Sequence, residues 1–184
     1  ELPVDQLLVE KKPEGEDAVP LDVLFVGGGP AGLSGAIELA RLIEQDSELS
    51  EIEIGVLEKA ADLGGHSLSG SVVNPVAFRE LFPDLKDEDF PFRRPVRKEK
   101  VTLLTKSGHY GLPTPPTMKN HGNYIASICE MVRWLGDKAE QKGVNILTGF
   151  PAEKLYLQDG RVCGVSTVPA GLNKDGQPGT NHMP

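Results

Sequence analysis

The chain has 184 residues and a mass of 19.8 kDa, enough for one domain with its own core. Gly 21 and Pro 15 together make 36 of 184 residues, and 39% are hydrophobic, a composition that excludes a wholly disordered chain. The net charge of −8 lacks the basic balance of a nucleic-acid binder, so we expect no nucleic-acid partner. No apolar run approaches the length of about 20 residues that a membrane-spanning helix needs.

The only two cysteines, Cys129 and Cys163, lie 34 positions apart and form no C-x-x-C pair. They are too few for a disulfide framework or a cysteine-ligated cluster, so we expect an intracellular protein with no metal site in this chain. Both are interpreted as small core residues rather than nucleophiles, because no base lies near either in the sequence. The chain opens with Glu1 and stops after a Gly- and Lys-rich stretch, and we expect it to be part of a longer protein.

The first sixty residues predict a βαβ unit. Residues 1–20 carry six acidic residues against two lysines and are expected to form an N-terminal arm or leader. Residues 21–26 and 52–57 are apolar runs typical of strands buried in a parallel sheet. Between them, apolar residues three and four apart predict a helix from Ala31 to about Gln45. This order predicts an α/β fold class with the βαβ unit of a Rossmann-like fold, and the motif described below makes this an FAD/NAD(P)-binding one.

The middle of the chain predicts a mixture of short elements. A short amphipathic helix is expected over 76–82, and a hairpin is expected to pair 101–104 with 110–112. Apolar residues three and four apart predict a longer helix over 125–139, with Asn123 as its N-cap and Gly143 as its C-cap.

The remaining residues predict β-structure and then a loop. We expect a parallel strand at 144–147 and a hairpin over 152–168, turned by Asp159 and Gly160 in a type I′ turn. A loop is expected at 169–184, the truncated C-terminus. The predicted domain therefore covers 21–168, with an inserted segment at about 66–120.

A glycine-rich loop is the strongest chemical signal. It is a G-x-G-x-x-G that follows the first predicted strand and opens the predicted helix, and it consists of Gly27, Gly28, Gly29, Pro30, Ala31 and Gly32. Such a loop lets the backbone approach a pyrophosphate, and the helix N-terminus supplies N–H groups to it. Glu58 ends the second strand, 26 residues after Gly32, where a carboxylate accepts hydrogen bonds from a ribose. We predict a dinucleotide site rather than a purely structural turn.

Longer strings of the sequence resemble a known family. The glycine loop, Glu58-Lys59 and the Gly64-Gly65 turn together resemble the FAD-binding glutathione-reductase-type superfamily rather than nicotinamide dehydrogenases. More specifically, residues 58–70, 74–83, 120–125 and 134–140 are similar, in the same order, to the N-terminal FAD-binding part of the electron transfer flavoprotein–ubiquinone oxidoreductase family. The similarity runs from about Leu21 to Gly176.

The resemblance implies a peripheral or monotopic membrane flavoenzyme that takes electrons from reduced electron transfer flavoprotein and passes them to ubiquinone. Its expected location is the matrix side of the mitochondrial inner membrane or the cytoplasmic side of a bacterial one. It implies FAD as cofactor, a [4Fe–4S] cluster only in a region beyond residue 184, and no catalytic side chain here. The expected cofactor-binding residues are Gly27, Gly28, Gly29, Pro30, Ala31, Gly32, Glu58, Lys59, Gly65 and His66.

Several alternatives stay open. The chain could belong to an FAD-dependent reductase or monooxygenase of the geranylgeranyl-reductase-like group, or be a non-catalytic fragment; on its own we expect it to be inactive. His66 either approaches the flavin or pyrophosphate or bonds the backbone of its loop. His121 either has a flavin-side role or belongs to a local capping network around Asn120 and Asn123. The basic run at 93–100 either docks an acidic partner or lipid headgroups or is a solvated strand edge, and we favour the edge.

The resemblance also implies a membrane-embedded surface that falls partly on the matching segment, from about Leu63 to Asp84. The residues there are too interrupted to span a bilayer, but a short helix with Phe78 and Phe82 on one side and Arg79 on the other has the form of an interfacial anchor. The alternative is that these side chains pack inside the protein.

Overall fold

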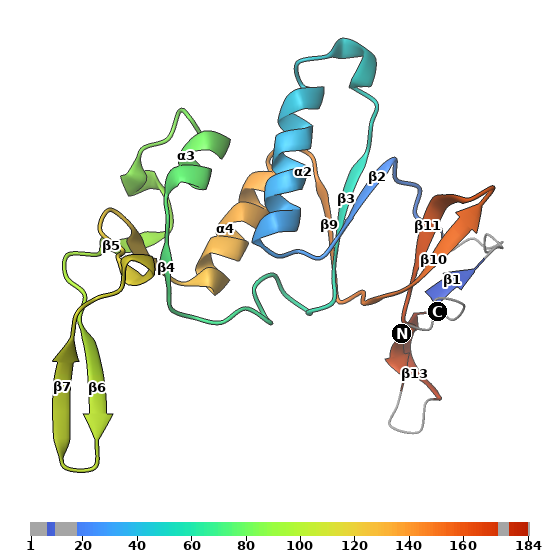
Figure 1. Cartoon of the computed structure of the whole chain (residues 1–184). Coiled ribbons are helices and arrows are strands. Elements are labelled where there is room, and N and C mark those ends of the chain that lie inside the picture. The colour runs from blue at the N-terminus through green and yellow to red at the C-terminus, as the bar shows by residue number, and fades with distance from the viewer. Residues whose placement is uncertain (1–6, 10–17, 173–176, 184) are drawn as a thin grey trace. The chain divides into compact units, whose positions relative to one another are not determined.

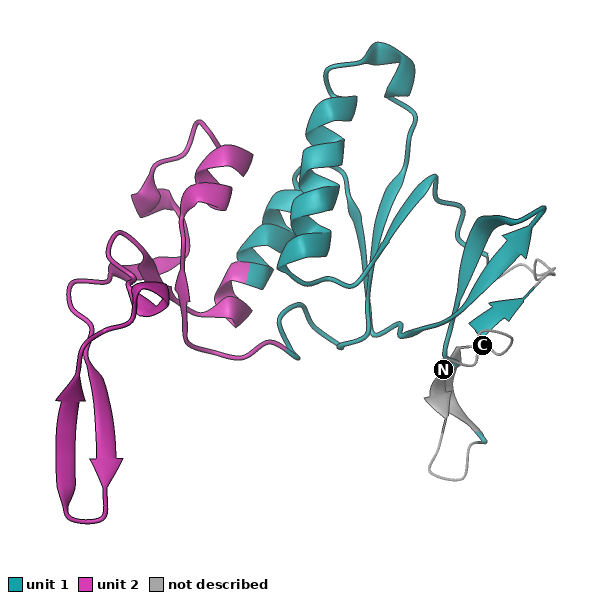
Figure 2. Ribbon diagram, viewed as in Figure 1, with its two compact units in different colours: residues 1–66, 132–184 teal, residues 67–131 magenta. Residues whose placement is uncertain are grey.

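The structure is a computed structural model that describes residues 7–9, 18–172 and 177–183. It divides into two compact units, which Figure 2 colours separately. Unit 1 comprises Glu1–His66 and Val132–Pro184, and unit 2 comprises Ser67–Met131. Unit 2 begins where the inserted segment was expected and extends past position 120.

A parallel sheet forms the centre of unit 1 (Figure 1). Its strands lie in the order β2 (Val23–Val26), β3 (Ile54–Glu58) and β9 (Asn145–Thr148). The middle strand β3 is almost wholly buried, as expected for a strand covered on both faces, and Val56 has no exposed surface. The three predicted strands and their parallel pairing are confirmed, with ends that differ by one or two residues.

Helix α2 (Pro30–Ile43) packs on this sheet through one apolar stripe. The buried side chains Leu33, Ala36, Ile37 and Ala40 recur at helical spacing, which confirms the predicted helix. A Cβ atom at Gly35 would lie 2.7 Å from Cε1 of Phe25 on β2. Glycine at this position therefore brings the helix close to the strand.

Helix α4 (Ile128–Glu140) begins later than the sequence predicts. Strand β8 (Tyr124–Ala126) takes up the first two residues expected in the helix, so the predicted start at 125 and the Asn123 cap are wrong. The Asn123 amide donates to Oδ1 of Asn120 instead, at 3.3 Å. Gly143 has φ +79° and closes the turn after the helix, where the sequence placed the C-cap.

Two further β-structures belong to unit 1. Strands β10 (Ala152–Gln158) and β11 (Arg161–Thr167) pair antiparallel around Asp159 and Gly160, whose φ values of 51° and 74° are those of the predicted type I′ turn. The short strand β1 (Leu8–Val9) pairs parallel with β10; the rest of the expected arm up to residue 17 lies outside the described residues. The loop expected from Ala170 is wrong in part, because β12 (Ala170–Leu172) and β13 (Pro178–Met183) pair antiparallel.

Unit 2 is built on a small antiparallel sheet in the order β4 (Ser71–Val73), β8, β5 (Phe92–Pro95). It also contains helix α3 (Val76–Leu81) and the hairpin of β6 (Val101–Thr105) and β7 (Gly108–Leu112), both close to their predicted positions. Short 3-10 helices occur in both units, at Ser47–Leu49, Asp87–Asp89 and Pro116–Met118.

Aromatic side chains fill the core of unit 2. The Phe78 ring packs edge-on against Phe90 and Phe92, with centroid distances of 5.3 and 5.2 Å, and it is only 8% exposed. Phe82 lies 6.4 Å from Phe90, and Tyr124 stacks on Phe92. The expectation that Phe78 inserts into a membrane is therefore wrong, because its ring is buried against Phe90 and Phe92 in the core of unit 2.

Candidate dinucleotide-binding site

The glycine loop joins β2 to α2 in the way that the G-x-G-x-x-G pattern requires. Gly27 has φ +112°, a conformation that disfavours other residues, and its N–H donates to the Leu57 carbonyl of β3 at 2.7 Å. A Cβ atom at Gly32 would collide with the carbonyl oxygen of Gly27. The first and last glycines of the motif are thus required by the backbone itself.

The helix N-terminus at this loop is suited to an anion. Gly29 is the N-cap residue of α2 and Pro30 follows it, yet no side chain caps the helix. A Cβ atom at Gly29 would have no atom within 4 Å, so open space adjoins the first turn. Uncapped N–H groups beside open space fit a phosphate group, since the helix dipole also favours negative charge there.

Glu58 lies beside this loop at the carboxyl end of β3. Its Oε2 accepts a hydrogen bond from the Gly28 N–H at 2.9 Å, and its Oε1 accepts one from the Ala60 N–H at 2.8 Å. A carboxylate has about four acceptor positions, so two such bonds leave capacity for a ribose hydroxyl. The predicted neighbourhood of Glu58 and the glycine loop is present, while ribose binding stays a prediction.

The segment after β3 is tightly turned. The Ala60 carbonyl accepts from the Gly149 N–H at 2.8 Å, and the Gly65 N–H donates to the Asp62 carbonyl at 3.0 Å. Lys59, Gly65 and His66 are exposed, as are Pro30 and Ala31 at the start of α2. Their contact with a cofactor stays a prediction, and both interpretations of His66 stay open.

Both cysteines are free. The Cys129 thiol is half-buried and donates to the Ser67 carbonyl at 2.8 Å, whereas Cys163 is exposed. The expectation of a core position is therefore wrong for Cys163, which lies on an exposed part of β11. Within the part of the chain that the structure describes, no group of three His, Cys, Asp or Glu residues could hold a metal ion.

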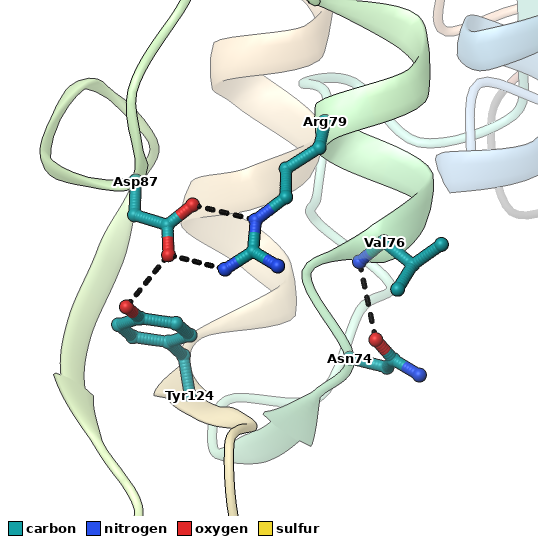
Figure 3. A network of polar contacts seen from close by, with 5 residues as sticks. All are labelled: Asn74, Val76, Arg79, Asp87 and Tyr124. Atoms are coloured by element: carbon teal, nitrogen blue, oxygen red, sulfur yellow. Dashed lines mark hydrogen bonds and ion pairs between the residues drawn. The ribbon is translucent and has the colours of Figure 1, made fainter.

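A polar network that the sequence analysis did not find lies in unit 2 (Figure 3). Arg79 donates from Nε and Nη2 to the two oxygens of Asp87, at 2.8 and 2.6 Å, and the Tyr124 hydroxyl donates to Oδ2 at 2.7 Å. The hydrogen bonds from Arg79 and then Tyr124 lower the pKa of Asp87 from 3.8 to about 2. The spacing of these three residues in the sequence does not predict the network, because they are brought together only by the folding of the sheet and the 3-10 helix.

The comparisons with known proteins agree on the fold. Residues 26–82 match the model of an NAD(P)-binding Rossmann-like domain. A solved geranylgeranyl bacteriochlorophyll reductase-like protein from Thermoplasma acidophilum matches 79% of this chain and 34% of its own, with TM-score 0.53 and 20% identity. The crystal structure of CtdE in complex with FAD matches 78% of this chain and 36% of its own, with TM-score 0.51 and 18% identity. The predicted α/β, Rossmann-like fold class is confirmed.

The similar sequences are more specific. Electron transfer flavoprotein-ubiquinone oxidoreductase of Rattus norvegicus is 43% identical over 162 residues, 86% of this chain and 26% of that protein. The Oryza sativa protein of the same name is 46% identical over 88% of this chain and 28% of its own. A bacterial protein, the probable electron transfer flavoprotein-ubiquinone oxidoreductase of Acinetobacter baylyi, is 42% identical over 91% of this chain and 30% of its own. The chain, which spans between a quarter and a third of these proteins, is thus related over most of its length to the electron transfer flavoprotein–ubiquinone oxidoreductases.

Proposed function

We propose that this chain is the FAD-binding portion of an oxidoreductase that passes electrons from reduced electron transfer flavoprotein to ubiquinone. The observation that carries the proposal is the uncapped N-terminus of α2 next to Glu58. It occurs in a chain whose relatives are named electron transfer flavoprotein-ubiquinone oxidoreductase. FAD, when bound, would supply the redox chemistry, and this chain would supply the binding of its ADP half.

Each part of the proposed site has its own task. The N–H groups of the first turn of α2 would bind the pyrophosphate, and the open space at Gly29 would admit it. Glu58 would hold the ribose while it keeps the glycine loop in place. Lys59, Gly65 and His66 would line the segment that follows. A [4Fe–4S] cluster would belong to the part of the full-length protein outside this chain.

A membrane contact fits the β6–β7 hairpin better than the Phe78 helix. Leu103, Leu104, Tyr110 and Leu112 are 52, 77, 63 and 47% exposed. Cationic residues at or near the hairpin are exposed as well, namely Arg97, Lys98, Lys100, Lys106 and Lys119. Exposed apolar side chains with adjacent cations suit an anionic lipid surface, in a chain whose net charge is −8. Among the described residues, no helix is long and apolar enough to cross a bilayer.

The test uses the full-length protein in detergent. Purified enzyme should show a flavin absorption spectrum and should reduce a ubiquinone analogue when reduced electron transfer flavoprotein is added. A geranylgeranyl-reductase-like enzyme or a monooxygenase would instead consume a nicotinamide cofactor and show no dependence on electron transfer flavoprotein. That second outcome would overturn the proposed electron donor while leaving FAD binding intact.

A further inference from the structure

Leu63 lies between two glycines from different elements of unit 1. A Cβ atom at Gly28, in the glycine loop, would be 2.8 Å from Cδ2 of Leu63. A Cβ atom at Gly136, in helix α4, would collide with Cδ1 of the same side chain. The two methyl groups of Leu63 therefore occupy the space that side chains at both positions would need.

Helix α4 also holds the main chain of Leu63. The Nε atom of Arg133 donates to the Leu63 carbonyl oxygen at 3.3 Å. Arg133 and Gly136 are three residues apart, so they lie on the same face of the helix. Glycine is a poor helix former, and its presence inside α4 is accounted for by the room that it leaves for Leu63.

The glycine loop is held from a second direction by Glu58. A Cβ atom at Gly28 would lie 3.0 Å from Cβ of Glu58, and the Gly28 N–H donates to Oε2 of that residue. Gly28 is buried, so its peptide group is enclosed by Leu63 and Glu58 together. Leu63 is half-buried, and its Cδ2 lies on the Gly28 side, so a displacement of its side chain toward Gly28 presses on the loop.

We propose that Leu63, Gly136 and Arg133 are positioning residues, through which α4 sets the position of the glycine loop for the cofactor. The inference rests on the proposed FAD site, since it concerns how that site is held in shape. None of the three residues is required to touch the cofactor. Their role would be to keep the Gly28 peptide and the start of α2 in the geometry that binds a pyrophosphate.

A size exchange between Leu63 and Gly136 tests the proposal in the full-length protein. Gly136→Ala should push Leu63 toward Gly28 and raise the FAD dissociation constant about tenfold or more, which corresponds to about 1.4 kcal/mol. Adding Leu63→Ala to that variant should recover most of the lost affinity, because the smaller side chain makes room for the new methyl group. The dissociation constant is measured by flavin fluorescence on apoprotein, and folding by circular dichroism.

A second variant and a control keep the test independent of folding. Arg133→Met removes the hydrogen bond to Leu63 at an exposed residue, and it should weaken FAD several-fold with little change in melting temperature. Gly164→Ala on β11 is the control, since its Cβ would meet Tyr156 only at an ordinary 3.6 Å. It should leave FAD affinity unchanged.

Three results would be distinguishable. If Gly136→Ala lowers the melting temperature but leaves FAD affinity as in the wild type, the contact is structural only and the inference is overturned. The same holds if the double variant binds no better than Gly136→Ala. If the wild-type protein itself binds no FAD, the proposed function fails instead.

Discussion

The Oε2 atom of Glu58 lies 2.9 Å from the backbone nitrogen of Gly28, 30 residues earlier in the chain. This bond joins the ends of two adjacent parallel strands, β2 and β3, at the edge where ligands bind in open α/β sheets. It gives Glu58 a structural task in addition to the proposed ribose contact. The first two predictions test the glycine loop and Glu58 in turn.

Gly29→Val should abolish FAD binding without unfolding unit 1. The new side chain would enter space that is open beside α2, so the protein loses no packing, whereas a pyrophosphate loses its approach to the backbone. We expect the flavin bound per mole of protein to fall sharply, because the pyrophosphate loses the backbone N–H groups that would hold it. Absorbance at the flavin bands per mole of protein is the measurement. Gly164→Val is the control, and normal flavin content in Gly29→Val would contradict the assignment of the loop.

Glu58→Gln should weaken both the loop and the cofactor site. The amide can no longer accept from Gly28 and Ala60 through two oxygens, because its nitrogen is a donor that faces one of the N–H groups. We expect a loss of FAD binding of about 1.5–3 kcal/mol, the range for a hydrogen bond to a charged group. Titration calorimetry with FAD gives the value. Glu53→Gln, just before the same strand, should change nothing; an equal loss there would show that the effect is one of net charge.

Asp87→Asn should make unit 2 less stable at neutral pH but not at very low pH. The pKa of Asp87 is lowered from 3.8 to about 2 by Arg79 and Tyr124, so the charged form is favoured in the folded state. Its stabilising effect is therefore present above about pH 4 and is lost as the pH falls through about 2. Urea unfolding at pH 7, 5, 3 and 2 should show a difference between wild type and variant that shrinks toward pH 2. A difference that stays constant with pH would contradict the network.

Phe78→Ala should destabilise unit 2 rather than detach the protein from membranes. The ring is 8% exposed and contacts Phe90 and Phe92, and truncation of a buried Phe costs about 3–5 kcal/mol. Thermal unfolding measures this loss. The membrane-bound fraction of whatever protein stays folded should be unchanged.

Leu103→Ser with Leu104→Ser should have the opposite effect. Both side chains are more than half exposed on the β6–β7 hairpin, so the fold should lose little stability. Each buried Leu contributes about 1.5–3 kcal/mol when removed from water, which makes the pair a substantial part of a peripheral contact. Sedimentation with anionic vesicles should therefore show a shift to the soluble fraction. If sedimentation is unchanged but the variant binds less of a hydrophobic dye, the exposed leucines contact the rest of the full-length protein instead of a membrane.

The sequence by itself determined the elements whose signals are local. The glycine loop, the 3.6-residue period of α2 and the Asp159-Gly160 turn act over a few residues, and the structure has all three where they were predicted. The fold class follows from their order. The neighbourhood of Glu58 and the loop follows too, because parallel strands bring their carboxyl ends to one edge of a sheet.

The tertiary structure decided which partner each apolar residue meets. Tyr124–Ala126 continue the helical period of α4 yet form a strand, because β4 and β5 supply hydrogen-bonding edges on both sides. The sequence around Phe78 is the same whether its helix is a membrane anchor or packs in a core. Only the contacts of its ring with Phe90 and Phe92 show that it packs in the core. Contacts between residues far apart in the sequence produce no periodic sequence pattern. The packing of Leu63 against Gly136 could therefore be found only in the folded chain.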